Sequence, residues 1–216
     1  MSRVRTAVLI SGRGTNLAAL IEAARAPDYP AEIALVISNR HESAGLAVAR
    51  AAGIPAQIIL HQDYDSREAF DRAIDVAVRV SSISLVCAAG FMRIHSEWFV
   101  RQWEGRLINI HPSLLPAFPG IKVHERVLQA GERISGCTVH FVTPELDSGP
   151  IIAQATVAVL PGDTRETLAE RVLAEEHKLY PQALAMVASG RVKLENDRAI
   201  FRDSSTDCSS LRHAPL

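Results

Sequence analysis

The feature that most constrains the fold is the alternation of short apolar runs with longer amphipathic segments in the first half of the chain. The apolar runs have the length of buried strands and cover residues 5–10, 32–38, 56–60, 83–88 and 106–110. The amphipathic segments predict helices over residues 16–26, 43–52 and 66–80, with Ser66 as the N-cap of the third. Strands that alternate with helices form parallel sheets covered on both faces. We therefore expect an α/β fold with a mostly parallel sheet flanked by helices.

The second half of the chain has a different pattern, which predicts antiparallel strands and one long helix. Residues 137–143 alternate apolar with polar side chains, which is the period of a half-exposed strand. Residues 151–160 predict one or two further antiparallel strands. Residues 164–189 predict a helix that begins at Thr164 and that Pro181 kinks or interrupts. The side chains expected to face inward from this helix are Thr167, Leu168, Val172 and Leu179.

Nothing in the sequence marks a linker or an internal repeat, so we expect residues 1–203 to form a single domain. A chain of 216 residues, 48% of them hydrophobic, is long and apolar enough for one well-formed core. The N-terminal half of this domain is expected over residues 1–105 and the C-terminal half over residues 106–203. The polar, serine-rich residues 204–216 predict a mobile tail.

Composition and charge exclude several classes of function. The formal net charge of −1 gives no basic surface for nucleic acid, and no apolar stretch reaches the roughly 18 residues of a membrane span. The first residues lack the apolar core of a signal peptide, so we expect a cytoplasmic protein. Cys87, Cys137 and Cys208 show no metal or redox spacing, and no HExxH pattern is present. We therefore expect small-molecule substrates, no nucleic acid, no membrane and no metal; the oligomeric state stays open, a homodimer included.

A glycine-rich loop, Ser11–Asn16, lies between the first predicted strand and the first predicted helix. Glycines there let the backbone approach a ligand, and a helix N-terminus offers free N–H groups to an anion. Leu17 occupies the place of the third glycine of the dinucleotide fingerprint, and Asn39 and Arg40 stand where that fingerprint needs an acid. The loop therefore favours a single phosphate monoester over a pyrophosphate, the alternative being a tight turn without a ligand.

The segment 107–120, LINIHPSLLPAFPG, carries the strongest chemical signal. Asn109 and His111 are two residues apart near the end of a predicted strand, so both side chains point to the same side. Ligands of open α/β sheets bind at the carboxyl ends of the strands. Asp147, in a turn-rich loop downstream, supplies a carboxylate for the imidazole. An amide, an imidazole and a carboxylate suit acyl-type transfer without a covalent intermediate, whereas the alternative is a structural histidine.

Three other groups of polar or apolar residues leave both a functional and a structural interpretation open. Residues 89–95 follow a buried strand, and their apolar side chains suit either a flat ring-binding pocket or plain core. His140 lies on the predicted half-exposed strand, facing solvent or a pocket wall. The charged run 175–177 lies on the long helix, where a solvated face is the favoured interpretation.

Six segments together resemble one known family. They are LISGRGTNL at 9–17, DSREAFD at 65–71, AGFMRI at 89–94, INIHPSLLP at 108–116, VHFVTPELDSGPII at 139–152 and EEHKLYP at 175–181. The chain resembles the phosphoribosylglycinamide formyltransferases, folate-dependent enzymes of IMP formation in de novo purine synthesis. The resemblance implies a Rossmann-like, nucleotide-binding N-terminal half, a folate-binding and catalytic C-terminal half, and 10-formyltetrahydrofolate as co-substrate. The loop after residue 116 departs from many relatives, because Ala117 stands where they carry lysine.

The resemblance also implies a role for each matching residue. The implied catalytic residues are Asn109, His111 and Asp147. The residues implied to bind the ribonucleotide are Gly14, Thr15, Asn16 and Glu176. The residues implied to contact folate are Arg67, Met92, Arg93, Ile94, His95, Asn109, Thr143, Pro144, Glu145, Leu146 and Asp147.

The mechanism expected from these residues is a direct attack by the substrate amine on the formyl carbon. Asn109 and protonated His111 would donate hydrogen bonds to the oxyanion, and Asp147 would assist proton transfer. The nearest alternative is a 10-formyltetrahydrofolate hydrolase, in which water replaces the amine. Methionyl-tRNA formyltransferases carry a further RNA-binding domain, for which the chain leaves no room. A catalytically silent nucleotide-binding module is disfavoured by the complete set of asparagine, histidine and aspartate.

Overall fold

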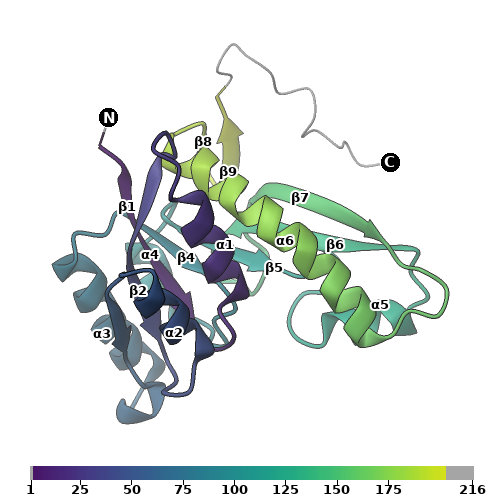
Figure 1. The fold of residues 1–216 in the computed structure, drawn as a ribbon, viewed down its shortest axis with the longest axis horizontal. Coiled ribbons are helices and arrows are strands. Elements are labelled where there is room, and N and C mark those ends of the chain that lie inside the picture. Colours follow the sequence, from purple (N-terminus) through teal and green to yellow (C-terminus); the bar gives the residue numbers. More distant parts are fainter. Residues whose placement is uncertain (1, 203–216) are drawn as a thin grey trace.

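The computed structural model describes residues 2–202, whose main feature is a seven-stranded sheet in the order β3-β2-β1-β4-β5-β6-β7 (Figure 1). The five strands from β3 to β5 are parallel, and β6 and β7 are antiparallel to their neighbours. The strands are β1 Val4–Ile10, β2 Ala31–Ser38, β3 Ala56–Ile58, β4 Leu85–Ala88, β5 Leu107–His111, β6 Ile134–Phe141 and β7 Ile151–Ala158. The predicted mostly parallel α/β sheet is therefore confirmed, and residues 151–160 contribute a single strand.

Helices cover both faces of this sheet. They are α1 Thr15–Ala23, α2 Ala44–Ala51, α3 Arg67–Val80, α4 Glu97–Gln102, α5 Val123–Gln129 and α6 Arg165–Ala188, with a 3₁₀ turn at His61–Asp63. In Figure 1, α1, α2 and α6 lie in front of the sheet, and the fainter α3 and α4 lie behind it. A separate hairpin, β8 Val192–Glu195 with β9 Arg198–Phe201, follows α6.

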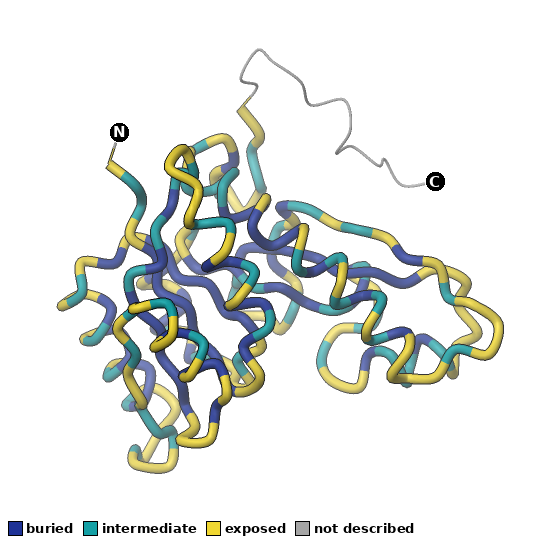
Figure 2. The backbone as a smooth tube through the Cα atoms, in the orientation of Figure 1, coloured by how far each residue is buried: buried dark blue, intermediate teal, exposed yellow. Residues whose placement is uncertain are grey.

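The two faces of the sheet build two hydrophobic clusters. Along β1, Val8 and Ile10 pack into the cluster under α1 and α6, whereas Ala7 and Leu9 pack into the cluster under α3 and α4. This alternation follows the two-residue period of a strand that is covered on both sides. Figure 2 shows the result as buried strands through the middle of the molecule and exposed loops around them.

The strand predicted over residues 137–143 is not half-exposed, which corrects the interpretation of its alternating sequence. Every residue of β6 from Ser135 to Phe141 is buried. The helix α6 packs on the strand. From the proline-rich turn, the backbone N–H of Leu115 donates a 3.0 Å hydrogen bond to the Thr138 hydroxyl. The Thr138 and His140 side chains of β6 are thus hydrogen-bonded inside the protein instead of facing water, whereas the buried Ser135 hydroxyl has no partner within residues 2–202.

The long helix α6 differs from its prediction at Thr167, and Pro181 does not interrupt it. It runs from Arg165 to Ala188 without interruption, with Pro181 inside it. The Tyr29 hydroxyl donates a 2.6 Å hydrogen bond to the Pro181 carbonyl, tying the helix to the segment after α1. Thr167 is exposed and does not face the core, because its side chain completes a capping box with Thr164. The predicted N-caps Thr164 and Ser66 are both confirmed.

The sheet continues from the N-terminal half of the chain into the C-terminal half. Ala88 of β4 pairs with Asn109 of β5, which in turn pairs with His140 of β6. Both halves therefore present their polar residues at a shared stretch of sheet. No helix within residues 2–202 is long and apolar enough to cross a membrane. The tail predicted over residues 204–216 lies outside the described residues.

Candidate active site

The structure brings Asn109, His111 and Asp147 together at the carboxyl end of β5. Asn109 and His111 are strand residues, and Asp147 lies in the loop between β6 and β7. The Nδ1 atom of His111 is 3.4 Å from Oδ2 of Asp147, and both side chains are less than a tenth exposed. The backbone N–H of Gly120 donates to the same carboxylate oxygen at 2.8 Å and fixes its position. A buried carboxylate and imidazole are thus aligned beside an amide.

His140 joins this cluster, and the sequence alone left its role open. Its Nδ1 is 2.9 Å from the Phe141 carbonyl, an arrangement that places the ring proton on Nδ1. The Nε2 atom then accepts from the Asn109 amide nitrogen at 3.3 Å. Burial lowers the pKa of His140, against the opposing effect of its hydrogen bond to Phe141 and of the Asp147 charge. A neutral His140 therefore orients the Asn109 amide. The pairing register of β5 and β6, which places Asn109 opposite His140, is the feature that identifies His140 as part of the site.

The turn after β5 closes over His111. The Nε2 atom of His111 is 3.0 Å from the Phe118 carbonyl oxygen, so each ring nitrogen faces an oxygen acceptor. Thr138 anchors the start of this turn by donating to the Ser113 carbonyl at 2.6 Å. Phe118 itself has a φ of 54°, in the left-handed region that bulky residues avoid. Strain of this kind clusters at ligand clamps and active sites.

A second pair of polar residues lies at the N-terminus of α1. Asn16 donates from Nδ2 to Oε2 of Glu176 on α6 at 2.6 Å, and both residues are buried. The prediction of a solvated face is therefore wrong for Glu176, because α1 packs directly against α6. Burial raises the pKa of Glu176, whereas the Asn16 hydrogen bond and the charge of Arg13 lower it. The preceding Gly14 has a φ of 75° and lies tightly against Gly45 of α2.

The segment 89–95 is held in place by two neighbouring loops. The backbone N–H of Met92 donates to the Ser11 hydroxyl at 2.7 Å, and that hydroxyl donates to the Asn39 side chain at 2.7 Å. The side chains of Met92 and Ile94 are 63% and 49% exposed, so they form an apolar surface open to a ligand. This segment begins one strand away from Asn109, because β4 pairs with β5.

The side chain of His95 points away from that open surface. Its Nδ1 lies 3.1 Å from Oδ1 of Asp71, and the ring stacks between Phe91 and Phe99. The other Asp71 oxygen accepts from the Ser96 backbone N–H. His95 and Asp71 therefore anchor the segment to α3, and only the backbone of His95 remains available for a ligand.

The remaining residues implied to contact folate lie on two exposed elements. Arg67 is the first residue of α3 and is exposed. The loop 143–147 ends at Asp147. Its Leu146 lies close to Gly120 and is 51% exposed. Because it contains Asp147, this loop lies beside His111. Within residues 2–202, no group of three or more His, Cys, Asp or Glu side chains is arranged to hold a metal ion.

A substitution at His140 tests whether this residue acts by orienting the Asn109 amide. His140→Leu removes the acceptor that orients the Asn109 amide and leaves the other members of the cluster in place. We expect kcat to fall by about fivefold, since a misaligned neutral hydrogen bond costs about 1 kcal/mol, with little change in either KM. Steady-state kinetics of the variant measure this. An unchanged kcat would show that Asn109 is oriented without His140.

Comparisons with known proteins agree with this architecture. A family model described as formyl transferase matches residues 4–184. The chain is 55% identical over 197 residues to the trifunctional purine biosynthetic protein adenosine-3 of Bos taurus, covering 91% of this chain and 20% of that protein. It therefore spans about a fifth of the length of that relative.

Shorter relatives align over nearly their whole length. Phosphoribosylglycinamide formyltransferase of Escherichia coli strain K12 is 43% identical over 192 residues, covering 89% of this chain and 91% of that one. The crystal structure of glycinamide ribonucleotide transformylase 1 from Symbiobacterium toebii has a TM-score of 0.90 at 46% identity, covering 93% of this chain and 95% of that one. On the family match and these similarities, the chain belongs to the formyl transferase family.

Proposed function

We propose that the protein transfers a formyl group from 10-formyltetrahydrofolate to the amine of phosphoribosylglycinamide, a step of de novo purine synthesis. The observation that carries the proposal is the convergence of Asn109, His111 and Asp147 at the carboxyl end of β5. The names of the relatives support the choice of acceptor. A cytoplasmic location goes with the proposal as a prediction.

The chemistry proposed for the cluster is direct acyl transfer. The substrate amine attacks the formyl carbon, and the carbonyl oxygen becomes an oxyanion that accepts from the Asn109 amide and from protonated His111. Preorganised donors of this kind stabilise the transition state more than the ground state. Asp147 accepts the proton that the amine loses, directly or through a water, and returns it to the folate nitrogen as the carbon–nitrogen bond breaks. No enzyme nucleophile is required, because the amine attacks by itself.

The protein groups must exchange partners before they act on a substrate. In the structure His111 Nε2 faces the Phe118 carbonyl, and Asn109 Nδ2 faces His140. A carbonyl oxygen entering between these groups would replace the internal acceptors. The strained backbone at Phe118 supports a turn that shifts when the substrates bind.

The residues present fit a folate donor. A pterin ring needs an apolar cover and backbone groups that read its edge. Met92, Ile94 and Leu146 are large apolar side chains left exposed on the two loops that flank the cluster. When bound there, the folate would supply the formyl group, and the segment 92–95 would hold its ring.

A turnover assay tests the proposed function against its alternatives. Purified protein and 10-formyltetrahydrofolate are mixed with phosphoribosylglycinamide, with no acceptor, or with an aminoacyl acceptor, and tetrahydrofolate release is followed. We expect release only with phosphoribosylglycinamide. Release without an acceptor would identify the hydrolase instead, and release with the aminoacyl acceptor would identify a tRNA-type formyltransferase.

The proposed ribonucleotide site gives a prediction of its own. Asn16→Ala is expected to raise the KM for phosphoribosylglycinamide about tenfold, since a hydrogen bond to a charged group is worth about 1.5 kcal/mol or more, and to leave the KM for folate unchanged. The loss of the Asn16 hydrogen bond raises the pKa of Glu176 further. As the pH is lowered, Glu176 is then protonated at a higher pH than in the unchanged protein. The affinity for the ribonucleotide should therefore begin to fall at a higher pH in the variant. Measurement of both KM values against pH checks this, and a larger effect on folate would contradict it.

A further inference from the structure

A cavity of about 560 Å³ lies beside the candidate active site but contains none of its catalytic residues. Its walls come from the loops that follow β1, β2 and β3, which meet at the carboxyl edge of the sheet. The residues that line it are Ser11, Gly12, Arg13, Asn39, Arg40, His41, Glu42, Ala44, Leu60, His61 and Gln62. Neither the trio nor Gly14, Asn16 or Glu176 contributes to these walls.

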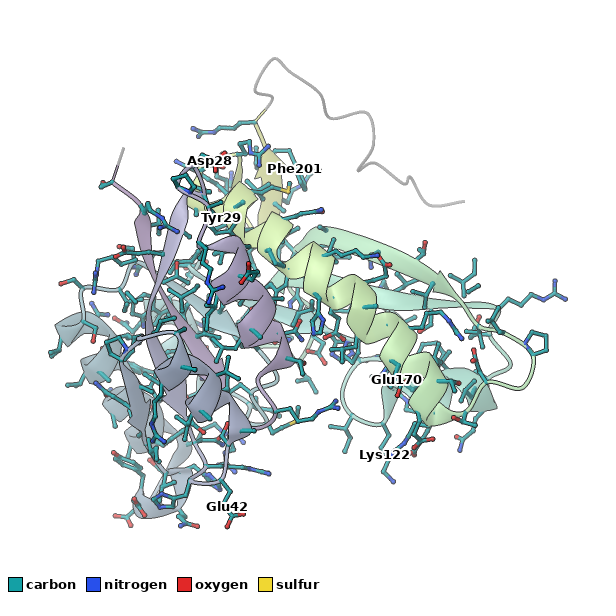
Figure 3. All side chains as sticks on the ribbon, in the orientation of Figure 1. Asp28, Tyr29, Glu42, Lys122, Glu170 and Phe201 are labelled. Atoms are coloured by element: carbon teal, nitrogen blue, oxygen red, sulfur yellow. The ribbon has the colours of Figure 1, made fainter. Side chains whose placement is uncertain are left out.

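The charges in this cavity are unbalanced. Arg13 and Arg40 stand against one carboxylate, that of Glu42, which Figure 3 labels at the edge of the molecule. Within residues 2–202, neither guanidinium has an ion pair or a hydrogen-bonded acceptor. The Nδ1 atom of His61 is buried without a hydrogen-bond partner. The two guanidinium groups therefore offer unsatisfied donors and positive charge to whatever enters the cavity.

The backbone adds to this potential. Ala44, the first residue of α2, lines the cavity, and the first turn of this helix holds no acidic residue. A helix N-terminus carries a partial positive charge and free N–H groups. Apart from its two histidines the cavity has no aromatic wall, and only Ala44 and Leu60 are apolar, so it lacks a slot for a nucleobase.

A hydrogen-bonded chain joins the cavity to the segment proposed to hold folate. Asn39 lines the cavity, and its side-chain oxygen accepts from the Ser11 hydroxyl, which accepts in turn from the backbone of Met92. A ligand in the cavity therefore lies close to the proposed pterin loop. It also lies close to Arg13, whose charge acts on Glu176.

We propose that this cavity is a binding site for a small multivalent anion, a ligand with two or more closely spaced carboxylates or phosphates. Two sources supply that chemistry: the γ-linked glutamate tail of a folate, which would rest on the proposed function, and a free phosphorylated metabolite, which would not. Arg40 and His61 bind the anion from opposite loops, and Glu42 opposes it.

Binding is tested on the full chain by calorimetry at low ionic strength, with γ-linked triglutamate and pyrophosphate as the two probes. We expect at least one probe to bind, about tenfold more weakly to Arg40→Ala and to His61→Ala. Glu42→Gln should tighten binding. Arg50→Ala removes the same charge from the exposed far end of α2, so it is the matched control and should change nothing. No binding of either probe, or equal losses in Arg40→Ala and Arg50→Ala, would overturn the site.

Kinetics distinguish the two sources. If the tail is the ligand, a triglutamyl donor has a lower KM than a monoglutamyl donor, and Arg40→Ala removes that advantage. If a free metabolite is the ligand, pyrophosphate binds without competing with the triglutamyl donor. Turnover of the monoglutamyl donor tests the proposed function separately, because that donor has no extended tail to place in the cavity.

Discussion

Asp147→Asn is expected to lower kcat by about 10²–10³-fold, with little change in either KM. This is the size of the effect of losing one preorganised hydrogen-bond donor to an oxyanion. The substitution keeps the shape of the side chain and an oxygen that accepts from the Gly120 N–H. It removes the negative charge that lies 3.4 Å from His111 and 3.9 Å from His140. The proposed stabilisation of protonated His111 and the proposed proton transfer depend on that charge, so one substitution affects both.

Steady-state kinetics with both substrates measure this effect. Glu170→Gln is the matched control, since Glu170 is an exposed carboxylate on α6 and belongs to no part of the cluster (Figure 3). Its kcat should equal that of the unchanged protein. A kcat for Asp147→Asn within a few-fold of the original would assign the proton transfer to another acid.

Gly14→Ala is expected to destabilise the protein by at least about 2 kcal/mol, because it combines left-handed strain with overpacking. A Cβ at this position would lie 2.5 Å from the Gly45 Cα, in a backbone with a φ of 75°. The contact is with backbone atoms on both sides, so no flexible side chain can move out of the way. The displaced loop should also weaken ribonucleotide binding.

Gly12, two residues earlier in the same loop, provides the control. A Cβ there would meet nothing within 4 Å, and its φ is not positive. Urea unfolding of both variants should show a lowered midpoint for Gly14→Ala alone. Equal midpoints would mean that the loop relaxes freely and that the contact with Gly45 is not a constraint.

The sequence predicts those parts of the fold in which the local pattern and the packing agree. The strands of the parallel sheet and the caps at Ser66 and Thr164 follow from apolar runs and from single side chains that satisfy helix N–H groups. The interpretation of β6 is wrong because alternation distinguishes two faces but does not show what covers each of them. The short helices α4 and α5 and the hairpin β8–β9 are held by tertiary contacts, and their few residues carry little periodic signal.

In the site, too, local sequence patterns predict some features and tertiary contacts determine the others. Asn109 and His111 share a face because of the strand period, which the sequence contains. The pairing of Asn109 with His140 depends on the register of two strands 31 residues apart, which no local pattern fixes. The contact between Asn16 and Glu176 spans 160 residues, and only the packing of α1 on α6 produces it. The residues and the pairing of His111 with Asp147 are therefore recognisable from the sequence, whereas the partners of Asn109 and Asn16 are not.

The continuous sheet limits how this protein can move. β5 is hydrogen-bonded to β4 on one side and to β6 on the other, so a rigid rotation of one half of the chain against the other would break backbone ladders. We therefore expect the loops 112–122 and 143–149, and not a hinge between the two halves, to open and close around ligands. Loop motions run in nanoseconds to microseconds, faster than the collective motions of domains. We therefore expect short segments on a stationary sheet to control the entry of substrate and the escape of product.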